Sequence, residues 1–272
     1  MRRMKKRKWR GILIGTVSAA VAITAWIAFC GYQWSWGPFA RLHDIKTAGL
    51  PGNAAQYNLA NVQKRTDSPL EGKHILFLGS SVTYGAASQG VSFADYIAAR
   101  NGCTITKEAV SGTTLVNSGS DSYISRLKKL DRSTATDLFV CQLSTNDATQ
   151  KKELGKVSES YDRGDFDTKT VAGAIEYVIS YAQETWDCPV VFYTNPQYNS
   201  PGYATMVELL GAIQQKWDIT VIDLWNDADF NAIAPEQREL YLADAIHPTK
   251  AGYLEWWTPY MENVLCEVIE NG

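Results

Sequence analysis

A serine and an Asp–His pair are the residues of this 272-residue sequence whose types and spacing suit nucleophilic catalysis. Ser81 follows the apolar run at residues 75–78 in HILFLGSSVTYG, and Asp244 and His247 stand three residues apart in DAIHP. A serine hydroxyl becomes a good nucleophile when a histidine takes its proton, and a carboxylate must orient that histidine and stabilise its charged form. Because Asp244 and His247 share one loop, the carboxylate can reach one ring nitrogen while the other faces the serine. We therefore predict a catalytic triad of Ser81, His247 and Asp244.

Attack on a carbonyl also creates an oxyanion, which needs preorganised hydrogen-bond donors. The candidate donors are the backbone N–H of Ser81, the backbone N–H of Gly112 and the side-chain amide of Asn146. Glycine at position 112 permits a close approach and an unusual φ. Taken singly, Ser81 and Gly112 are equally typical of turns and Asn146 of a helix cap, so the assignment depends on their acting together.

Neighbouring polar residues have simpler interpretations. Ser80 competes with Ser81 for the role of nucleophile, whereas Asp147 and Asp223 are expected to support their loops. His43 lies in the lead-in and His74 begins the first apolar run, and neither has a carboxylate neighbour in a loop expected to face a cleft.

The pattern of apolar residues predicts alternating strands and helices. Short apolar runs predict strands at residues 75–78, 103–107, 138–143, 190–193 and 220–224. Helical spacing predicts helices at residues 92–100, 123–130, 170–186, 203–217 and 249–269. Such alternation implies right-handed crossovers and a mostly parallel five-stranded sheet covered on both faces, which is a three-layer α/β/α sandwich of the flavodoxin-like type.

In sheets of this kind, ligands gather at the carboxyl ends of the strands. Ser81 follows the first predicted strand, Gly112 the second and Asn146 the third, while Asp244 and His247 follow the last after a connecting segment. The predicted architecture therefore brings all five residues to one edge of the sheet.

The sequence resembles the SGNH, or GDSL-type, serine hydrolases in four blocks over residues 73–268, and within that family a membrane-anchored bacterial member. The matching blocks are GSSV at 79–82, EAVSGTT at 108–114, STND at 144–147 and DAIH at 244–247. The resemblance implies an esterase without a cofactor, with Ser81 as nucleophile, Gly112 and Asn146 as oxyanion donors, and Asp244 and His247 completing the triad.

Two positions depart from the family's pattern. Ser80 stands where the family usually has aspartate, and Ser144 where it usually has glycine two residues before the asparagine. Neither change removes a group that performs the chemistry, although both bear on how the loops are supported. The G-x-S-x-G elbow of another hydrolase fold is absent, because Thr83 occupies the place of its second glycine.

The N-terminus has the pattern of a membrane anchor. MRRMKKRKWR holds seven of the 26 basic residues and no acid, and residues 11–40 carry no charge. The apolar part, ILIGTVSAAVAITAWIAFC, is about as long as the roughly 20 residues that a membrane-spanning helix needs. Trp9, Tyr32, Trp34 and Trp36 flank it, as aromatic residues do at membrane interfaces. We predict a cytoplasmic tail at 1–10, a transmembrane anchor at 11–31 and an external body.

Two alternatives for this segment fit less well. A cleaved signal peptide usually has a shorter apolar region followed by a small-x-small site, and none is convincing here. IAFC resembles a lipoprotein cleavage box, but Phe29 is too bulky for the residue before the cysteine. The breakers Gly49, Pro51, Gly52 and Pro69 indicate a stalk or lead-in at 32–72, before a hydrolase domain at 73–272.

Composition excludes several other classes. Beyond the first ten residues, 19 basic residues face 29 acidic ones, so we expect no nucleic-acid partner. The cysteines outside the apolar segment have no C-x-x-C spacing, so neither a zinc site nor a required disulfide is predicted. We expect no metal and no cofactor, and no obligate protein partner is evident.

The substrate is the least determined part of the sequence interpretation. Tyr161, Tyr193, Tyr198 and Tyr203 stand near loops expected to border the cleft, and aromatic and polar surfaces suit sugar rings. We favour an O-acetyl or short acyl ester on a cell-envelope or extracellular glycan. The alternatives are a lipid esterase or lysophospholipase, an O-acyltransferase with the same triad, and a catalytically silent glycan-binding module.

Overall fold

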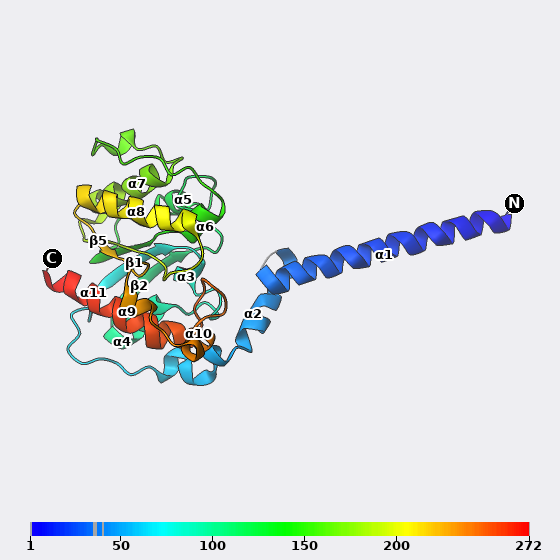
Figure 1. Ribbon diagram of the computed structural model, residues 1–272, viewed down its shortest axis with the longest axis horizontal. Coiled ribbons are helices and arrows are strands. Elements are labelled where there is room, and N and C mark those ends of the chain that lie inside the picture. The colour runs from blue at the N-terminus through cyan, green and yellow to red at the C-terminus, as the bar shows by residue number, and fades with distance from the viewer. Residues whose placement is uncertain (1, 35–36, 40, 272) are drawn as a thin grey trace. The chain divides into compact units, whose positions relative to one another are not determined.

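The computed structural model describes residues 2–34, 37–39 and 41–271, and their side chains except those of residues 2–14, 33 and 34. The chain divides into two compact units, Met1–Leu50 and Pro51–Gly272 (Figure 1). Each is described by itself.

The N-terminal unit consists of helix α1 (Arg2–Trp34), a 3-10 turn (Gly37–Phe39) and helix α2 (Arg41–Ala48). Within α1, Gly15–Tyr32 has a mean hydropathy of 1.5 and is long and apolar enough to cross a membrane, a criterion that a signal sequence also meets. Val17, Val21 and Trp26 are exposed on this helix, as suits contact with lipid. Of the predicted interface aromatics, Tyr32 is exposed, whereas the side chains of Trp9 and Trp34 and all of Trp36 lie outside the described residues.

The second unit contains the predicted three-layer sandwich. Its five strands are parallel, in the order β2-β1-β3-β4-β5. Their bounds are β1 (His74–Gly79), β2 (Thr104–Ala109), β3 (Leu138–Gln142), β4 (Val190–Tyr193) and β5 (Thr220–Ile222). The helices are α3 (Ser81–Tyr84), α4 (Phe93–Asn101), α5 (Tyr123–Leu127), α6 (Thr145–Thr149), α7 (Val171–Trp186), α8 (Pro201–Lys216), α9 (Ala228–Asn231), α10 (Pro235–Tyr241) and α11 (Thr258–Asn271).

Alternate residues of the central strands face opposite layers, as the pleat of a strand requires. Leu76 and Leu78 of β1 pack into a core with α5, α7 and α8, whereas Ile75 and Phe77 pack into a core with α4 and α11 (Figure 1). Because both faces are covered, the central strands are mostly apolar on both sides, and this is why short apolar runs predicted them.

The predicted elements are present, with local differences at their ends. The strand predicted at 138–143 ends at Gln142, and the last predicted helix contains a π-helical turn at Gly252–Trp257 before continuing as α11. A Cβ at Gly252 would lie 2.2 Å from the carbonyl oxygen of Tyr241, so this turn packs directly against the end of α10.

The segment from Pro51 to residue 72 belongs to the second unit. It contains three short 3-10 turns, Pro51–Asn53, Ala55–Tyr57 and Leu59–Asn61. Tyr57 and Leu70 are buried in the core that α4 and α11 share. This part of the predicted lead-in is therefore packed against the α/β body.

Candidate active site

The turn after β1 and the loop after α10 bring Ser81 and His247 together. Ser81 is the first residue of α3, directly beyond the carboxyl end of β1, and its Oγ lies 2.8 Å from Nε2 of His247. Ser81 is 7% exposed, whereas the His247 side chain is 24% exposed. A hydroxyl at this distance can donate its proton to the ring, which is the geometry of an activated nucleophile.

Asp244 holds the other side of the histidine ring. Its carboxylate oxygens lie 3.0 and 2.8 Å from Nδ1 of His247 and accept hydrogen bonds from the backbone N–H groups of Ile246 and His247 at 2.8 Å. Partial desolvation raises the pKa of Asp244. The hydrogen bond from the His247 ring, the attraction to the charge of that ring and the two backbone N–H donors outweigh this effect and bring the pKa of Asp244 to about 2. Asp244 therefore stays ionised near neutral pH, and Nε2 of His247 is the nitrogen free to accept the proton of Ser81.

The loop that carries the dyad is tied at both sides. The backbone N–H of Ala243 donates to the carbonyl of His247 at 2.9 Å, and Leu242 and Pro248 form an antiparallel bridge. Asn195, buried beyond the end of β4, donates its side-chain amide to the carbonyl of Ile246 at 3.3 Å.

Two of the three predicted oxyanion donors are Gly112, in the loop after β2, and Asn146, in the first turn of α6, and these two segments contact each other. Gly112 has φ = +79°, a left-handed conformation that favours glycine, and a Cβ there would meet nothing within 4 Å. The amide nitrogen of Asn146 donates one hydrogen to the carbonyl of Thr113 at 3.0 Å. Its second amide hydrogen and the N–H groups of Ser81 and Gly112 have no hydrogen-bond acceptor among the described residues. Three donors are thus available to a ligand.

Ser144 and Asp147 support this arrangement. The Ser144 hydroxyl donates to the same carbonyl of Thr113 at 3.2 Å and accepts from the N–H of Asn146 at 3.2 Å. Asp147 is fully buried and accepts from the N–H groups of Leu115 and Val116 at 2.7 and 3.0 Å. Burial raises the pKa of Asp147, and these two donors oppose the rise. Asp147 therefore fastens the loop that follows Gly112 to the first turn of α6, which carries Asn146.

Gln142 is a supporting residue that the sequence patterns did not single out. Its Oε1 accepts from the N–H and the hydroxyl of Ser80, at 2.9 and 3.2 Å, and from the hydroxyl of Thr83 at 2.9 Å. The Thr83 hydroxyl also lies 2.6 Å from the hydroxyl of Tyr193. A buried glutamine on the neighbouring strand therefore holds the turn that presents Ser81. It does so through Ser80, the residue that stands where the family usually has aspartate. The only signal in the sequence was a polar residue inside an apolar strand.

Arg126 is a second supporting residue that sequence reasoning missed. It is 5% exposed, and its guanidinium donates to the carbonyls of Gly79, Glu108 and Asp121 at 2.8 to 2.9 Å. It also donates to the hydroxyl of Thr113 at 3.1 Å. One side chain thus joins the carboxyl ends of β1 and β2 to the loop that carries Gly112 and Thr113. Its signal was a basic residue within an otherwise apolar helical face.

Only one of the four tyrosines predicted near the cleft lines a hollow at the carboxyl edge of the sheet. Tyr193 and Tyr203 are fully buried in the core. Tyr161 packs at the opposite end of α8, where its hydroxyl donates to the carbonyl of Lys216 at 3.2 Å. Tyr198 lines a hollow of about 400 Å³ together with Gln197, Asn199, Ser200, Pro201, Ala204 and Trp225. The expectation for Tyr193 and Tyr203 was wrong because β4 and α8 direct these two rings into the core. The expectation for Tyr161 was wrong because its loop lies at the far end of α8.

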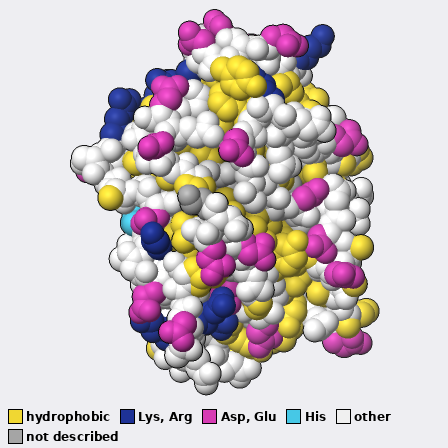
Figure 2. Space-filling view, turned by 90° about the vertical axis from the view of Figure 1, so that its left-hand side faces the viewer, with side chains coloured by type: hydrophobic (Ala, Val, Ile, Leu, Met, Phe, Trp, Pro, Cys, Tyr) yellow, Lys and Arg dark blue, Asp and Glu magenta, His cyan; other side chains and the backbone are white. Residues whose placement is uncertain are grey.

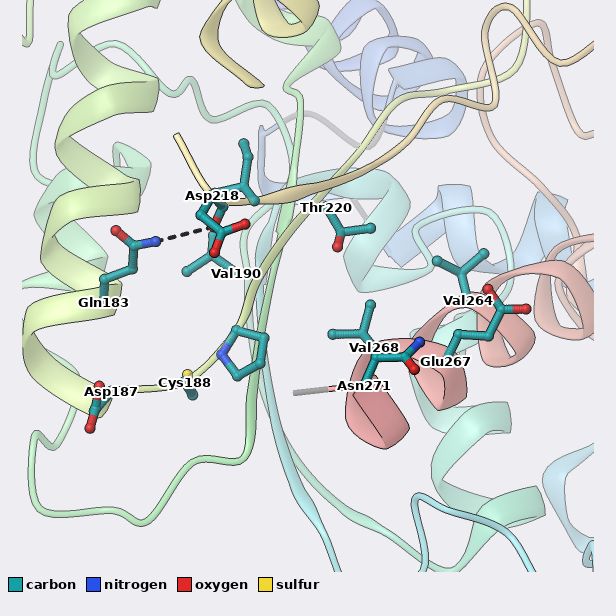
Figure 3. A pocket seen from close by; sticks show the side chains of 12 residues that line it. Gln183, Asp187, Cys188, Val190, Asp218, Thr220, Val264, Glu267, Val268 and Asn271 are labelled. Atoms are coloured by element: carbon teal, nitrogen blue, oxygen red, sulfur yellow. Dashed lines mark hydrogen bonds between the residues drawn. The ribbon is translucent and has the colours of Figure 1, made fainter. Parts of the chain in front are cut away.

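A larger cavity lies away from this site. It has a volume of about 680 Å³ and is lined at the amino ends of β4 and β5 by Cys188, Asp218 and Thr220, and by Val264 and Glu267 of α11 (Figure 3). On this face of the molecule, apolar side chains run along the middle and acidic side chains lie beside them (Figure 2). Because Ser81 is at the opposite ends of the strands, the cavity is separate from the candidate active site.

The described part of the chain contains no group of three or more His, Cys, Asp or Glu residues placed to hold a metal ion. The five cysteines are free and buried. Burial raises the pKa of the Cys103 and Cys188 thiols to about 11. These thiols therefore pack as small apolar groups.

Comparison with known proteins agrees with the fold and covers the site. A model of the GDSL-like lipase/acylhydrolase family matches residues 77–254, a range that includes the five predicted site residues. A Lactobacillus plantarum protein of known structure is 20% identical over 72% of this chain and 98% of its own, with a TM-score of 0.59. A candidate GDSL-like lipase from Bacteroides ovatus is 19% identical over 72% and 99%, with a TM-score of 0.53.

A candidate lipolytic protein of the G-D-S-L family from Desulfitobacterium hafniense is 15% identical over 71% of this chain and 99% of its own, with a TM-score of 0.54. At these identities the structural likeness shows the fold alone. No curated protein sequence matches the chain significantly.

Proposed function

Because the chain belongs to the GDSL-like lipase/acylhydrolase family and is therefore an ester-bond hydrolase, we propose that it is a serine esterase in which Ser81 attacks the ester carbonyl. The observation that carries this proposal is the continuous contact from Ser81 Oγ through the His247 ring to Asp244, with distances of 2.8 Å on both sides of the ring.

Each residue of the proposed triad has one task. His247 takes the proton of Ser81 as the Oγ–carbonyl bond forms, while ionised Asp244 stabilises the resulting imidazolium. The imidazolium then gives its proton to the departing alcohol, which leaves an acyl group on Ser81. Water, activated by the same histidine, attacks the acyl-enzyme and releases the acid, so that Ser81 and His247 return to their starting states.

The oxyanion formed in both steps would be stabilised by the N–H groups of Ser81 and Gly112 and by the free amide hydrogen of Asn146. The segments that carry these donors are already held in place by hydrogen bonds to Thr113, Asp147 and Gln142, so little reorganisation is needed during the reaction. Preorganisation of this kind is what makes such donors effective.

The substitution Ser81→Ala tests the nucleophile. We expect hydrolysis of 4-nitrophenyl acetate to fall at least about 10³-fold, with unchanged circular dichroism and thermal unfolding. Ser80→Ala is the matched comparison, because the Ser80 hydroxyl is fully buried and donates to Gln142. Retained activity in Ser81→Ala together with loss in Ser80→Ala would assign the reaction to the other serine.

For the substrate, we propose an O-acetyl or other short acyl ester on an extracellular or cell-envelope glycan. Within residues 51–271, the exposed large apolar side chains are Tyr84, Val110 and Tyr161, and the first two belong to the segments that carry Ser81 and Gly112. Tyr84 ends the helix that begins with Ser81, and Val110 stands two residues before Gly112. Exposed side chains of this kind offer an aromatic ring and a short apolar contact, which suit a sugar ring better than a long acyl chain, because a long chain needs enclosure to bury its area.

Acetate release from acetylated glycans should therefore exceed release of fatty acid from lysophospholipids in parallel assays. The reverse order would favour the lipid esterase. Transfer of acetate to an added sugar acceptor would favour the acyltransferase, because the acceptor hydroxyl would replace water at the same acyl-enzyme. Failure of a serine-reactive fluorophosphonate to label Ser81 would favour a silent binding module.

We further propose that α1 anchors the protein in the membrane, with the N-terminus in the cytoplasm and the α/β body outside. The length and apolar surface of α1 and the basic residues before its apolar part support this topology. Protease added to intact spheroplasts should digest the body, whereas protection until lysis would reverse the topology. N-terminal sequencing of the mature protein distinguishes an anchor from a cleaved signal sequence.

A further inference from the structure

Residues 51–58, which precede the α/β body in sequence, contact the loop that carries His247. Gly52 makes the closest approach, because a Cβ there would lie 2.0 Å from the carbonyl oxygen of Leu240 and 2.3 Å from Oγ1 of Thr249. Any side chain at position 52 would push this segment away from the loop. We call residues 51–58 the clasp.

Asn53 of the clasp bonds to both sides of the site. The residue is 5% exposed, and its Oδ1 accepts from the backbone N–H of Lys250 at 2.8 Å. Its amide nitrogen donates to the carbonyl of Ala87 at 2.7 Å. Lys250 stands three residues after His247, and Ala87 stands six residues after Ser81, so one side chain joins the histidine loop to the segment that follows the nucleophile helix.

Lys250 makes a second connection of the same kind. It is 7% exposed, and its Nζ donates to Oδ1 of Asn58 in the clasp at 2.8 Å and to Oε1 of Gln89 at 2.7 Å. Gln89 follows the nucleophile helix, as Ala87 does. Burial lowers the pKa of Lys250. Its ammonium group donates to the side-chain amide oxygens of Asn58 and Gln89, which compensate in part for the lost water.

The loop transmits this support to the histidine. The N–H of Thr249 donates to the carbonyl of Tyr241 at 2.8 Å, and its hydroxyl donates to the carbonyl of Leu240 at 2.7 Å. With Ala243 bonded to His247 across the loop, residues 240–250 form a closed unit. Movement of Thr249 or Lys250 would therefore move His247 relative to Ser81.

We propose that the clasp is part of the catalytic apparatus, in which Asn53 and Asn58 act as positioning residues that hold His247 at hydrogen-bond distance from Ser81. This inference rests on the proposed function, because it requires His247 to be the base and acid of the reaction. It also places the functional start of the catalytic unit at Pro51 or earlier, well before the first strand.

A displaced histidine has a chemical signature that general loss of folded protein does not share. An alkoxide leaves poorly unless His247 protonates it, whereas 4-nitrophenolate leaves without a proton. Displacement of His247 should therefore slow hydrolysis of an alkyl acetate more than hydrolysis of 4-nitrophenyl acetate. A smaller folded fraction would reduce both rates by the same factor.

The test compares the full chain, purified in detergent, with its Asn53→Ala and Asn58→Ala variants on 4-nitrophenyl acetate and on ethyl acetate. Misplacement near a reacting group costs up to about 10²-fold in rate, so we expect kcat for ethyl acetate to fall about 10- to 100-fold in Asn53→Ala. We expect the ratio of the two rates to change at least about fivefold, since proton transfer to the leaving group contributes only to the alkyl ester. Asn58→Ala loses one bond from a half-buried residue and should show a smaller change in the same direction.

Asn263→Ala is the matched control. Asn263 is exposed on α11, outside the clasp and the histidine loop, so its substitution should leave both rates unchanged. An unchanged ratio in Asn53→Ala and Asn58→Ala would overturn the clasp proposal, even if both rates fall. If Asn53→Ala does not fold, Asn58→Ala decides the outcome. Failure of the proposed function would instead appear as retained activity in Ser81→Ala.

Discussion

Asn146→Ala separates transition-state stabilisation from folding at the candidate site. The substitution removes one bond made in the resting protein, the 3.0 Å bond to the carbonyl of Thr113, and one amide hydrogen left free for a ligand. Loss of the first should lower the free energy of unfolding by about 1 kcal/mol. Loss of an oxyanion donor typically raises the activation barrier by about 2.7–4 kcal/mol, or about 10²–10³-fold in kcat. Because domains unfold at about 5–15 kcal/mol, the folded fraction stays near one and kcat reports the site.

The assay is steady-state hydrolysis of 4-nitrophenyl acetate with thermal unfolding of the same samples. Gln150→Ala is the control, because the Gln150 amide donates to the carbonyl of Gly112 at 3.2 Å from an exposed position. We expect this control to stay within about threefold of the unmodified protein, as exposed surface substitutions usually change stability by no more than about 0.5 kcal/mol. If Asn146→Ala also stays within that range, Asn146 is not an oxyanion donor.

Three further substitutions test the supporting contacts. Asp244→Asn should lower kcat by about 10²–10⁴-fold. The stability that ionised Asp244 contributes is complete above the ordinary carboxyl pKa of 3.8 and is lost as the pH falls through about 2. The melting temperatures of this variant and of the unmodified protein should therefore converge only in strong acid. Convergence already at pH 5 would contradict this reasoning. Gln142→Leu leaves at least two buried donors of the nucleophile turn unpaired and should lower the free energy of unfolding by about 2–6 kcal/mol in urea titrations. Arg126→Lys keeps the charge but loses the planar fork, so we expect a loss of about 1–3 kcal/mol, and equal stability would show that the fork is not needed.

Several features of the site could be predicted because they depend on short stretches of sequence. The apolar run before Ser81 predicts a buried strand that ends at a polar turn, and the spacing of Asp244 and His247 permits a carboxylate–imidazole contact within one loop. The alternation of strands and helices predicts a parallel sheet, whose carboxyl edge collects Gly112 and Asn146. These inferences need only local periodicity and the geometry of right-handed crossovers.

Other features could not be predicted because they depend on which way a side chain points. Tyr161 and Tyr198 both stand in loops, yet the first packs at the far end of α8 and the second lines a hollow at the carboxyl edge of the sheet. Gln142 bonds to Ser80, 62 positions away, and Arg126 bonds to Gly79, 47 positions away. Such partners are brought together by packing of whole elements, and no local pattern records them.

The sequence by itself therefore determined the class of fold, the order of the strands along the chain and the residues able to form a serine nucleophile with its base. Only the tertiary structure decided how those residues are held. It placed Gln142 of the neighbouring strand against the backbone N–H of Ser80, and it placed Asn53 against the histidine loop. The physical reason is that a buried donor or acceptor must find a partner wherever the fold places one, and that partner can lie anywhere along the chain.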